Sequence, residues 1–180
     1  MILSQLNALK EAYKEALESR FLSKRYAWAS LQTFVDNWQT EALDFAPMYA
    51  RSFENTLANP LWEGRDYYPK KAMLELIARD EDLIRKMFKE LFNEGLDIEG
   101  RTDRFLYHCN ALRDDIMREK PKYQQHYHTG YKMISIYLAF KYPTHYCIYD
   151  FPAWKSFMEK IGAKPIPENH DIGRFFKVMR

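Results

Sequence analysis

Apolar side chains recur at spacings of three and four residues along most of this 180-residue chain. The segments 2–22, 83–92 and 98–118 each keep this spacing over several turns, which places their apolar residues on one face of an α-helix. Strict alternation, which would indicate strands, is scarce, and the chain has only six glycines. The length fits one domain. We therefore expect an all-α, single-domain array of about eight helices, with room for one short extended pair around residues 144–150.

Local signals mark where several of these helices begin and end. Pro69 suits a first helical turn, where its missing N–H costs nothing. Asp80 and Asp150 precede apolar stripes and are predicted N-caps, because their carboxylates can accept from free backbone N–H groups. Gly162 follows the stripe of the helix after Asp150 and predicts its end. The stretch 131–142 is apolar almost all round, which predicts the central helix of the core.

Net charge, cysteine count and the length of apolar runs limit the environment and the partners of the chain. A net charge of +2 does not argue for nucleic-acid binding by the whole molecule, although a local basic face stays open. The two cysteines, Cys109 and Cys147, are no disulfide framework, and charges interrupt the first residues before a signal peptide could form. No run reaches the roughly 18 apolar residues of a membrane span. We expect a cytoplasmic protein in a reducing compartment, without membrane contact.

Histidine and cysteine gather in three places that could supply metal ligands. These are His108-Cys109, His126-x-His128 and His145-x-Cys147, and none has the spacing of a standard zinc motif. Cys109 falls on the apolar stripe of its helix, which favours a place in the core. We therefore expect no metal site and no cofactor, with the histidines bonded to backbone groups.

A search of the sequence for catalytic motifs gives no support for an enzyme. His145 and Cys147 would face the same side of a strand, but a cysteine flanked by tyrosines is more often a packing residue. The chain has no phosphate-binding glycine loop, no H-E-x-x-H and no G-x-S-x-G. We expect no catalytic residue in this chain, and an independent Cys/His enzyme is the least favoured of three hypotheses.

Basic groups are interleaved with tyrosines around the histidine-rich loop, a pattern suited to nucleic acid. Phosphates bind to Lys and His, and bases stack on tyrosine rings. The simpler alternative is a solvated helix end, where cations offset the helix dipole. A second basic cluster lies near a helix junction and contains Arg20, Lys24 and Arg25. The residues selected as DNA contacts are His126, Tyr127, His128 and Lys132, followed by Lys122 and Arg25.

Four ordered segments give the chain a family resemblance. They are PMYARSFENTLANPLWEGRDYYPKKAMLELI, IRKMFKELFNEGLDIEGRTDRFLYHCNAL, HYHTGYKMISIYLAFKYPTHYCIYDF and IPENHDIGRFFKVMR. Together they resemble the N-terminal region of bacterial McrB-like proteins, the AAA+ NTPase subunits of modified-cytosine restriction systems. The likeness runs from about residue 44 to residue 180, after an N-terminal helical pair in residues 1–43. It departs at Thr129-Gly130, where the family is expected to carry acidic residues.

The resemblance implies a role and leaves an alternative open. It implies a non-catalytic recognition or regulatory module that precedes an AAA+ motor in a longer protein and contacts DNA. Walker motifs are absent from these 180 residues, so nucleotide hydrolysis would belong to the motor. The alternative is a protein-interaction module that docks a nuclease subunit or supports assembly of an oligomer, with the aromatic loop 61–68 as its contact surface.

Overall fold

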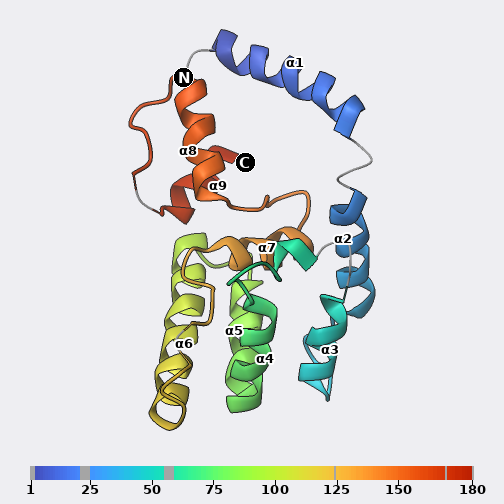
Figure 1. Cartoon of the computed structure of the whole chain (residues 1–180), viewed down its shortest axis with the longest axis vertical. Coiled ribbons are helices and arrows are strands. Elements are labelled where there is room, and N and C mark those ends of the chain that lie inside the picture. The colour runs from blue at the N-terminus through green and yellow to red at the C-terminus, as the bar shows by residue number, and fades with distance from the viewer. Residues whose placement is uncertain (1–2, 21–24, 55–58, 124, 169, 180) are drawn as a thin grey trace.

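The chain folds into an all-α array in the computed structural model, which describes residues 3–20, 25–54, 59–123, 125–168 and 170–179, with the backbone alone for 16–20 and 25–28. Within these ranges there are nine α-helices and no strand, which confirms the predicted fold class (Figure 1). The helices are α1 (Leu3–Arg20), α2 (Arg25–Asn37), α3 (Phe45–Ser52), α4 (Pro69–Arg79), α5 (Glu81–Leu91), α6 (Ile98–Glu119), α7 (Lys132–Lys141), α8 (Phe151–Lys160) and α9 (Ile172–Met179), with a 3₁₀ turn, η2, at Asn59–Leu61.

Helix α7 occupies the centre of the array. It crosses one end of the side-by-side helices α4, α5 and α6, and α8, α9 and α1 lie on its other side (Figure 1). Every residue from Met133 to Phe140 is buried. A helix that is apolar on all faces is stable in water only when neighbours cover it, and here they do. The sequence prediction of a central helix is confirmed.

Capping residues begin the helices where the sequence indicated. The Asp80 carboxylate accepts from the backbone N–H of Leu83 at 2.9 Å, and Asp150 accepts from that of Ala153 at 3.0 Å. Pro69 occupies the first turn of α4. Gly162 follows α8 with a φ of 61°, a left-handed conformation that glycine adopts without steric cost. These features depend on neighbouring residues only, which is why they could be read from the sequence.

The extended pair considered around residues 144–150 is not formed. This segment has no ladder partner within the described residues, where the one β-bridge joins Gly64 to Tyr67. The backbone N–H of Tyr149 donates to the Ser135 hydroxyl of α7 at 2.7 Å instead. The segment is thus held against the central helix by a side chain, which takes the place of a neighbouring strand.

Aromatic rings fill the space between α2, α3, α5, α6 and α7. The Phe88 ring lies with its centroid within 4.9 to 6.1 Å of six other aromatic rings. Phe88 and Tyr137 are both fully buried. The pairs with Trp38, Phe105 and Tyr137 are edge-to-face, and such pairs stabilise a core by about 0.5–1.5 kcal/mol each beyond the area that they bury. The high aromatic content of the chain therefore supplies a rigid interior.

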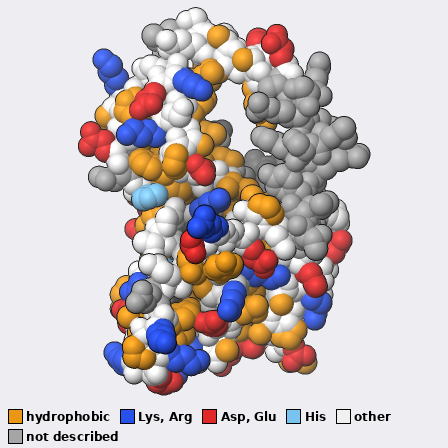
Figure 2. Space-filling view, viewed as in Figure 1, with side chains coloured by type: hydrophobic (Ala, Val, Ile, Leu, Met, Phe, Trp, Pro, Cys, Tyr) orange, Lys and Arg blue, Asp and Glu red, His pale blue; other side chains and the backbone are white. Residues whose placement is uncertain are grey.

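The outer surface is mixed in charge. Figure 2 shows Lys and Arg side chains beside Asp and Glu over the visible face, without a broad field of one sign. No helix in the described part of the chain is both long and apolar enough to cross a membrane. On the face seen in Figure 2, attraction for an anionic partner therefore comes from a local arrangement of side chains.

Candidate functional site

The histidine-rich loop between α6 and α7 directs its side chains alternately into and out of the molecule. His126 and His128 are 1% and 0% exposed, whereas Tyr127 between them is partly exposed. Tyr127 has a φ of 62°, which is uncommon for a large side chain and has to be held by its surroundings. The two buried rings supply that support through the hydrogen bonds described next.

A continuous chain of hydrogen bonds, the histidine network, connects α3, α6, α7 and the loop. The Tyr49 and Tyr137 hydroxyls are 2.8 Å apart, and Tyr137 Oη lies 3.0 Å from His128 Nε2. His128 Nδ1 bonds to the carbonyl oxygen of His126, and the N–H of His128 donates to His126 Nδ1 at 3.1 Å. His126 Nε2 lies 2.9 Å from Asn110 Oδ1. Both rings thus use both of their nitrogens.

The partners fix which nitrogen of each ring carries hydrogen. His128 Nδ1 faces a carbonyl oxygen and must donate, so its Nε2 holds a lone pair and accepts from Tyr137. His126 Nδ1 accepts from a backbone N–H, so its Nε2 donates to Asn110. Each ring is satisfied in its neutral form, and a buried neutral network of this kind rigidifies the loop.

Burial sets the electrostatics of the network. It lowers the pKa of His128 to about 3, with a further lowering from His126. It lowers the pKa of His126 to about 4, and the nearby Arg113 adds to the effect. Burial also raises the pKa of Tyr49 and Tyr137 far above the ordinary value for tyrosine. All four groups are therefore uncharged at neutral pH.

Acid is expected to destabilise the protein through these two histidines. Above about pH 6.5 the rings are neutral in both states, so they give no pH dependence. Below that value the unfolded chain takes up protons that the folded rings resist down to about pH 4 and 3. The free energy of unfolding should fall with pH by up to about 2.7 kcal/mol per unit when both rings contribute. Urea titrations followed by circular dichroism between about pH 4 and pH 8 measure this slope.

A pair of variants separates the contribution of the buried histidines to this slope from that of the carboxylates, which also titrate in acid. His128→Asn removes one of the buried rings and should make the slope shallower. His145→Asn replaces an exposed ring and should leave the slope unchanged. An identical slope in wild type and His128→Asn would contradict this assignment.

Cys109 lies beside the two buried rings. The thiol belongs to α6 and is fully buried, as its place on an apolar stripe predicted. One donor atom each of Cys109, His126 and His128 lie within 4.8 Å of one another. Burial raises the pKa of this thiol well above its ordinary value. Neither His108 nor His145 belongs to this group: of the three clusters seen in the sequence, the fold keeps His126 and His128 together and adds Cys109 without its neighbour His108.

The aromatic loop 61–68 and the histidine-rich loop meet, beside the start of α4, at a hollow of about 330 Å³. We call it the tyrosine–lysine hollow. The Tyr127 ring packs edge-on against Tyr67 and Tyr68, with centroids 5.8 and 6.3 Å away. Lys132 Nζ lies 5.5 Å from the centroid of the Tyr67 ring. The hollow is lined by Tyr68, Lys71, Ala72, Glu75, Lys122, Tyr123, Gln125 and Tyr127. The aromatic loop 61–68 and the histidine-rich loop, which the sequence offered as two separate contact surfaces, therefore form one surface.

The selected contact residues occupy three different environments. Tyr127 and Lys122 line the hollow, and Lys132 lies next to it. His126 and His128 have no exposed ring surface, so they support the loop and are left out of the contact surface proposed below. The Arg25 side chain, like those of Arg20 and Lys24, lies outside the described part of the structure. Sequence inspection missed Lys71 and Gln125, since neither lies in a marked motif.

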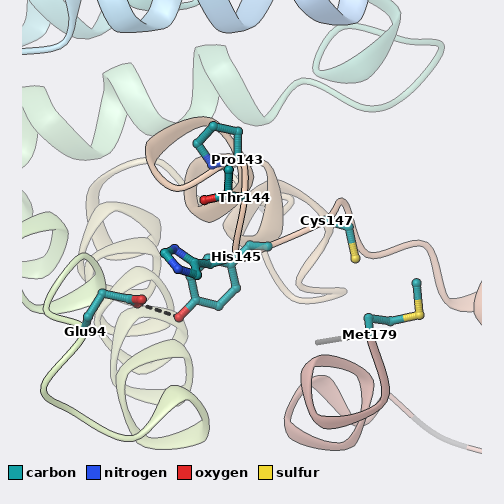
Figure 3. A pocket seen from close by; sticks show the side chains of 7 residues that line it. Glu94, Pro143, Thr144, His145, Cys147 and Met179 are labelled. Carbon is teal, nitrogen blue, oxygen red and sulfur yellow. Dashed lines mark hydrogen bonds between the residues drawn. The ribbon is translucent and has the colours of Figure 1, made fainter.

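A second hollow, of about 700 Å³, lies where the 143–147 segment meets α9, and it contains His145 and Cys147. Figure 3 shows the His145 ring on the side of Glu94 and the Cys147 sulfur on the side of Met179. The Glu94 carboxylate accepts from the Tyr146 hydroxyl at 2.5 Å and from the buried Arg101 at 2.7 Å. Burial raises the pKa of Cys147, whereas a nucleophile needs a lowered one. This geometry gives the Cys/His enzyme hypothesis no support.

No family model, no curated protein and no solved structure matches this chain.

Proposed function

We propose that this chain is a non-catalytic recognition module that contacts DNA through the tyrosine–lysine hollow. The observation that supports it is the convergence of Tyr67, Tyr68 and Tyr127 with lysines from three segments, Lys71, Lys122 and Lys132. Aromatic rings stack on bases of any sequence, and ammonium groups bind the phosphates between them. The resemblance to McrB-like proteins adds a context, in which such a module precedes an AAA+ motor.

The polar groups of the hollow favour a nucleic acid over a simple anion. Glu75 contributes a carboxylate and Gln125 an amide beside the lysines. A carboxylate repels phosphate, but carboxylates and amides are among the side chains that hydrogen-bond to base edges. The hollow thus combines lysines that can bind the DNA phosphates with a carboxylate and an amide that can bind the bases.

Substitution of Tyr127, a partly exposed tyrosine that lines the hollow, gives the most direct test. Tyr127→Ala should weaken binding of DNA about 5- to 150-fold, since stacking of one base on an aromatic ring contributes about 1–3 kcal/mol. Lys122→Ala should weaken all DNA sequences alike and reduce the slope of log affinity against log salt by about 1. Fluorescence anisotropy with single-stranded DNA and with duplexes that contain plain or modified cytosine, at several salt concentrations, measures both effects.

Two substitutions outside the hollow serve as controls. Tyr107 on α6 is 68% exposed, and Lys86 on α5 is exposed. Tyr107→Ala and Lys86→Ala should leave affinity unchanged. Absence of DNA binding, or an affinity that does not fall as salt rises, would sink the proposal.

The alternative, a protein-interaction module, uses the same surface with a different chemistry. Tyr68 is 43% exposed, and tyrosine is enriched in protein interfaces. Trp62 of the same loop is fully buried against Phe53, so the loop offers less apolar surface than its sequence suggested. Binding of a nuclease subunit that is lost in Tyr68→Ala and Tyr127→Ala but retained in Lys122→Ala would favour this alternative.

A further inference from the structure

The group formed by Cys109, His126 and His128 has the composition of a metal site. It brings one sulfur and two imidazole nitrogens within 4.8 Å of one another, and all three residues are at most 1% exposed. Thiolate and imidazole together suit thiophilic ions such as copper and zinc. Since these residues come from α6 and the loop before α7, only the tertiary fold assembles them.

Hydrogen bonds already orient both rings as ligating histidines are oriented. A metal-bound histidine usually donates its other ring N–H to an oxygen, which fixes the tautomer and the direction of the free lone pair. His128 donates from Nδ1 to the carbonyl of His126, and His126 donates from Nε2 to the Asn110 side chain. The lone pairs of His128 Nε2 and His126 Nδ1 are therefore the ones that could bind a metal ion.

We propose that Cys109, His126 and His128 bind one cuprous ion. The Cys109 thiol releases its proton to bulk water, a bond forms between the sulfur and Cu(I), and the two imidazole lone pairs complete the coordination. The thiolate carries one negative charge and the ion one positive charge, so the buried site is as neutral after binding as before. No electron is transferred in this step.

Charge and ligand number favour Cu(I) over zinc. Zn²⁺ on the same thiolate and two neutral imidazoles would leave a net positive charge in the interior, which is costly without a carboxylate. Among the described residues this donor group has three members, whereas structural zinc is held by four. A catalytic zinc would need water at a fourth position, and these side chains are closed to solvent.

Binding requires a local rearrangement that the network permits. Tyr137 must give up its bond to His128 Nε2, but its hydroxyl keeps Tyr49 as a partner at 2.8 Å. His126 Nδ1 must give up the N–H of His128, which is a long bond at 3.1 Å. The donation from His128 Nδ1 to the His126 carbonyl and the donation from His126 Nε2 to Asn110 stay intact.

The experiment is a competition for Cu(I) against a chromophoric chelator of known affinity, with the full chain under anaerobic conditions. Wild type should withdraw one Cu(I) per chain and unfold at a higher temperature in its presence. Cys109→Ser should weaken binding by more than about 100-fold, since loss of an outer-shell partner alone already costs about 10- to 100-fold. Cys147→Ser, which changes the other cysteine, should bind as wild type. Zn(II) and Co(II) in the same assay should bind more weakly.

Two results would overturn the proposal: no withdrawal of Cu(I) by wild type, or equal withdrawal by Cys109→Ser. Circular dichroism shows whether that variant is folded. If it is not, X-ray absorption of the wild-type complex decides, since it should show one sulfur and two nitrogens, and a shell of nitrogen and oxygen alone contradicts the site. Tyr137→Phe keeps all three ligands and should retain binding. The site is independent of the DNA proposal, so each can fail without the other.

Discussion

Replacing Phe88 with alanine is expected to lower the free energy of unfolding by about 3–5 kcal/mol. The ring is fully buried and is surrounded by six aromatic rings from α3, α6, α7 and the residues that directly follow α2 and α5. Large neighbouring rings cannot collapse into the space that it leaves, so a cavity remains. Since a domain is stable by only about 5–15 kcal/mol, this loss is a large fraction of its stability.

Urea denaturation followed by circular dichroism at neutral pH measures the change. Tyr107→Ala is the matched control, because it also removes an aromatic ring but from a position that is 68% exposed. Its effect should stay within about 0.5 kcal/mol. A loss of less than about 1 kcal/mol in Phe88→Ala would show that this core is not packed as described.

Removal of one hydroxyl from the centre of the histidine network is expected to cost about 2–4 kcal/mol. Tyr137→Phe leaves His128 Nε2 without a donor and the Tyr49 hydroxyl without an acceptor, and both groups are buried. Each unpaired buried group costs about 1–3 kcal/mol. The phenyl ring itself keeps its contacts with Phe88 and Phe105, so packing changes little.

Tyr49→Phe provides the comparison, because it stands at the end of the same hydrogen-bond chain. It removes one bond and leaves Tyr137 able to donate to His128, so the expected loss is about 1 kcal/mol. The losses of unfolding free energy in the two variants are measured in the same urea titration. Which loss is larger tests the direction in which the hydrogen bonds run from Tyr49 through Tyr137 to His128. Equal losses, or a larger loss in Tyr49→Phe, would contradict the tautomers assigned to the histidines.

Local features of this fold were predictable because they depend on residues close in sequence. Asp80 and Asp150 cap helices through backbone N–H groups three residues away. The apolar stretch 131–142 predicted α7 and its central place, since an apolar surface on all sides has to be covered. Cys109 was placed in the core by its helical phase. In each case one element carries its own signal.

The roles of His126 and His128 were beyond local reasoning. Polar rings in a Pro-bounded loop suggested a surface, and the chain instead buries them. Their burial is tolerable only because Asn110 of α6 and Tyr137 of α7 supply partners from two other elements. Without those partners the same burial would leave polar groups unpaired, and no spacing in the sequence shows that the partners exist.

The sequence by itself determined the helices, their caps, the central position of α7 and the chemical character of the two loops. Only the tertiary structure decided that the two loops share one hollow, with Tyr127 against Tyr67 and Tyr68. It alone decided that Cys109 pairs with His126 and His128, while its sequence neighbour His108 stays outside the group. The physical reason is range: helix periodicity and capping act over three or four residues, whereas these groups meet only because core packing closes the chain on itself.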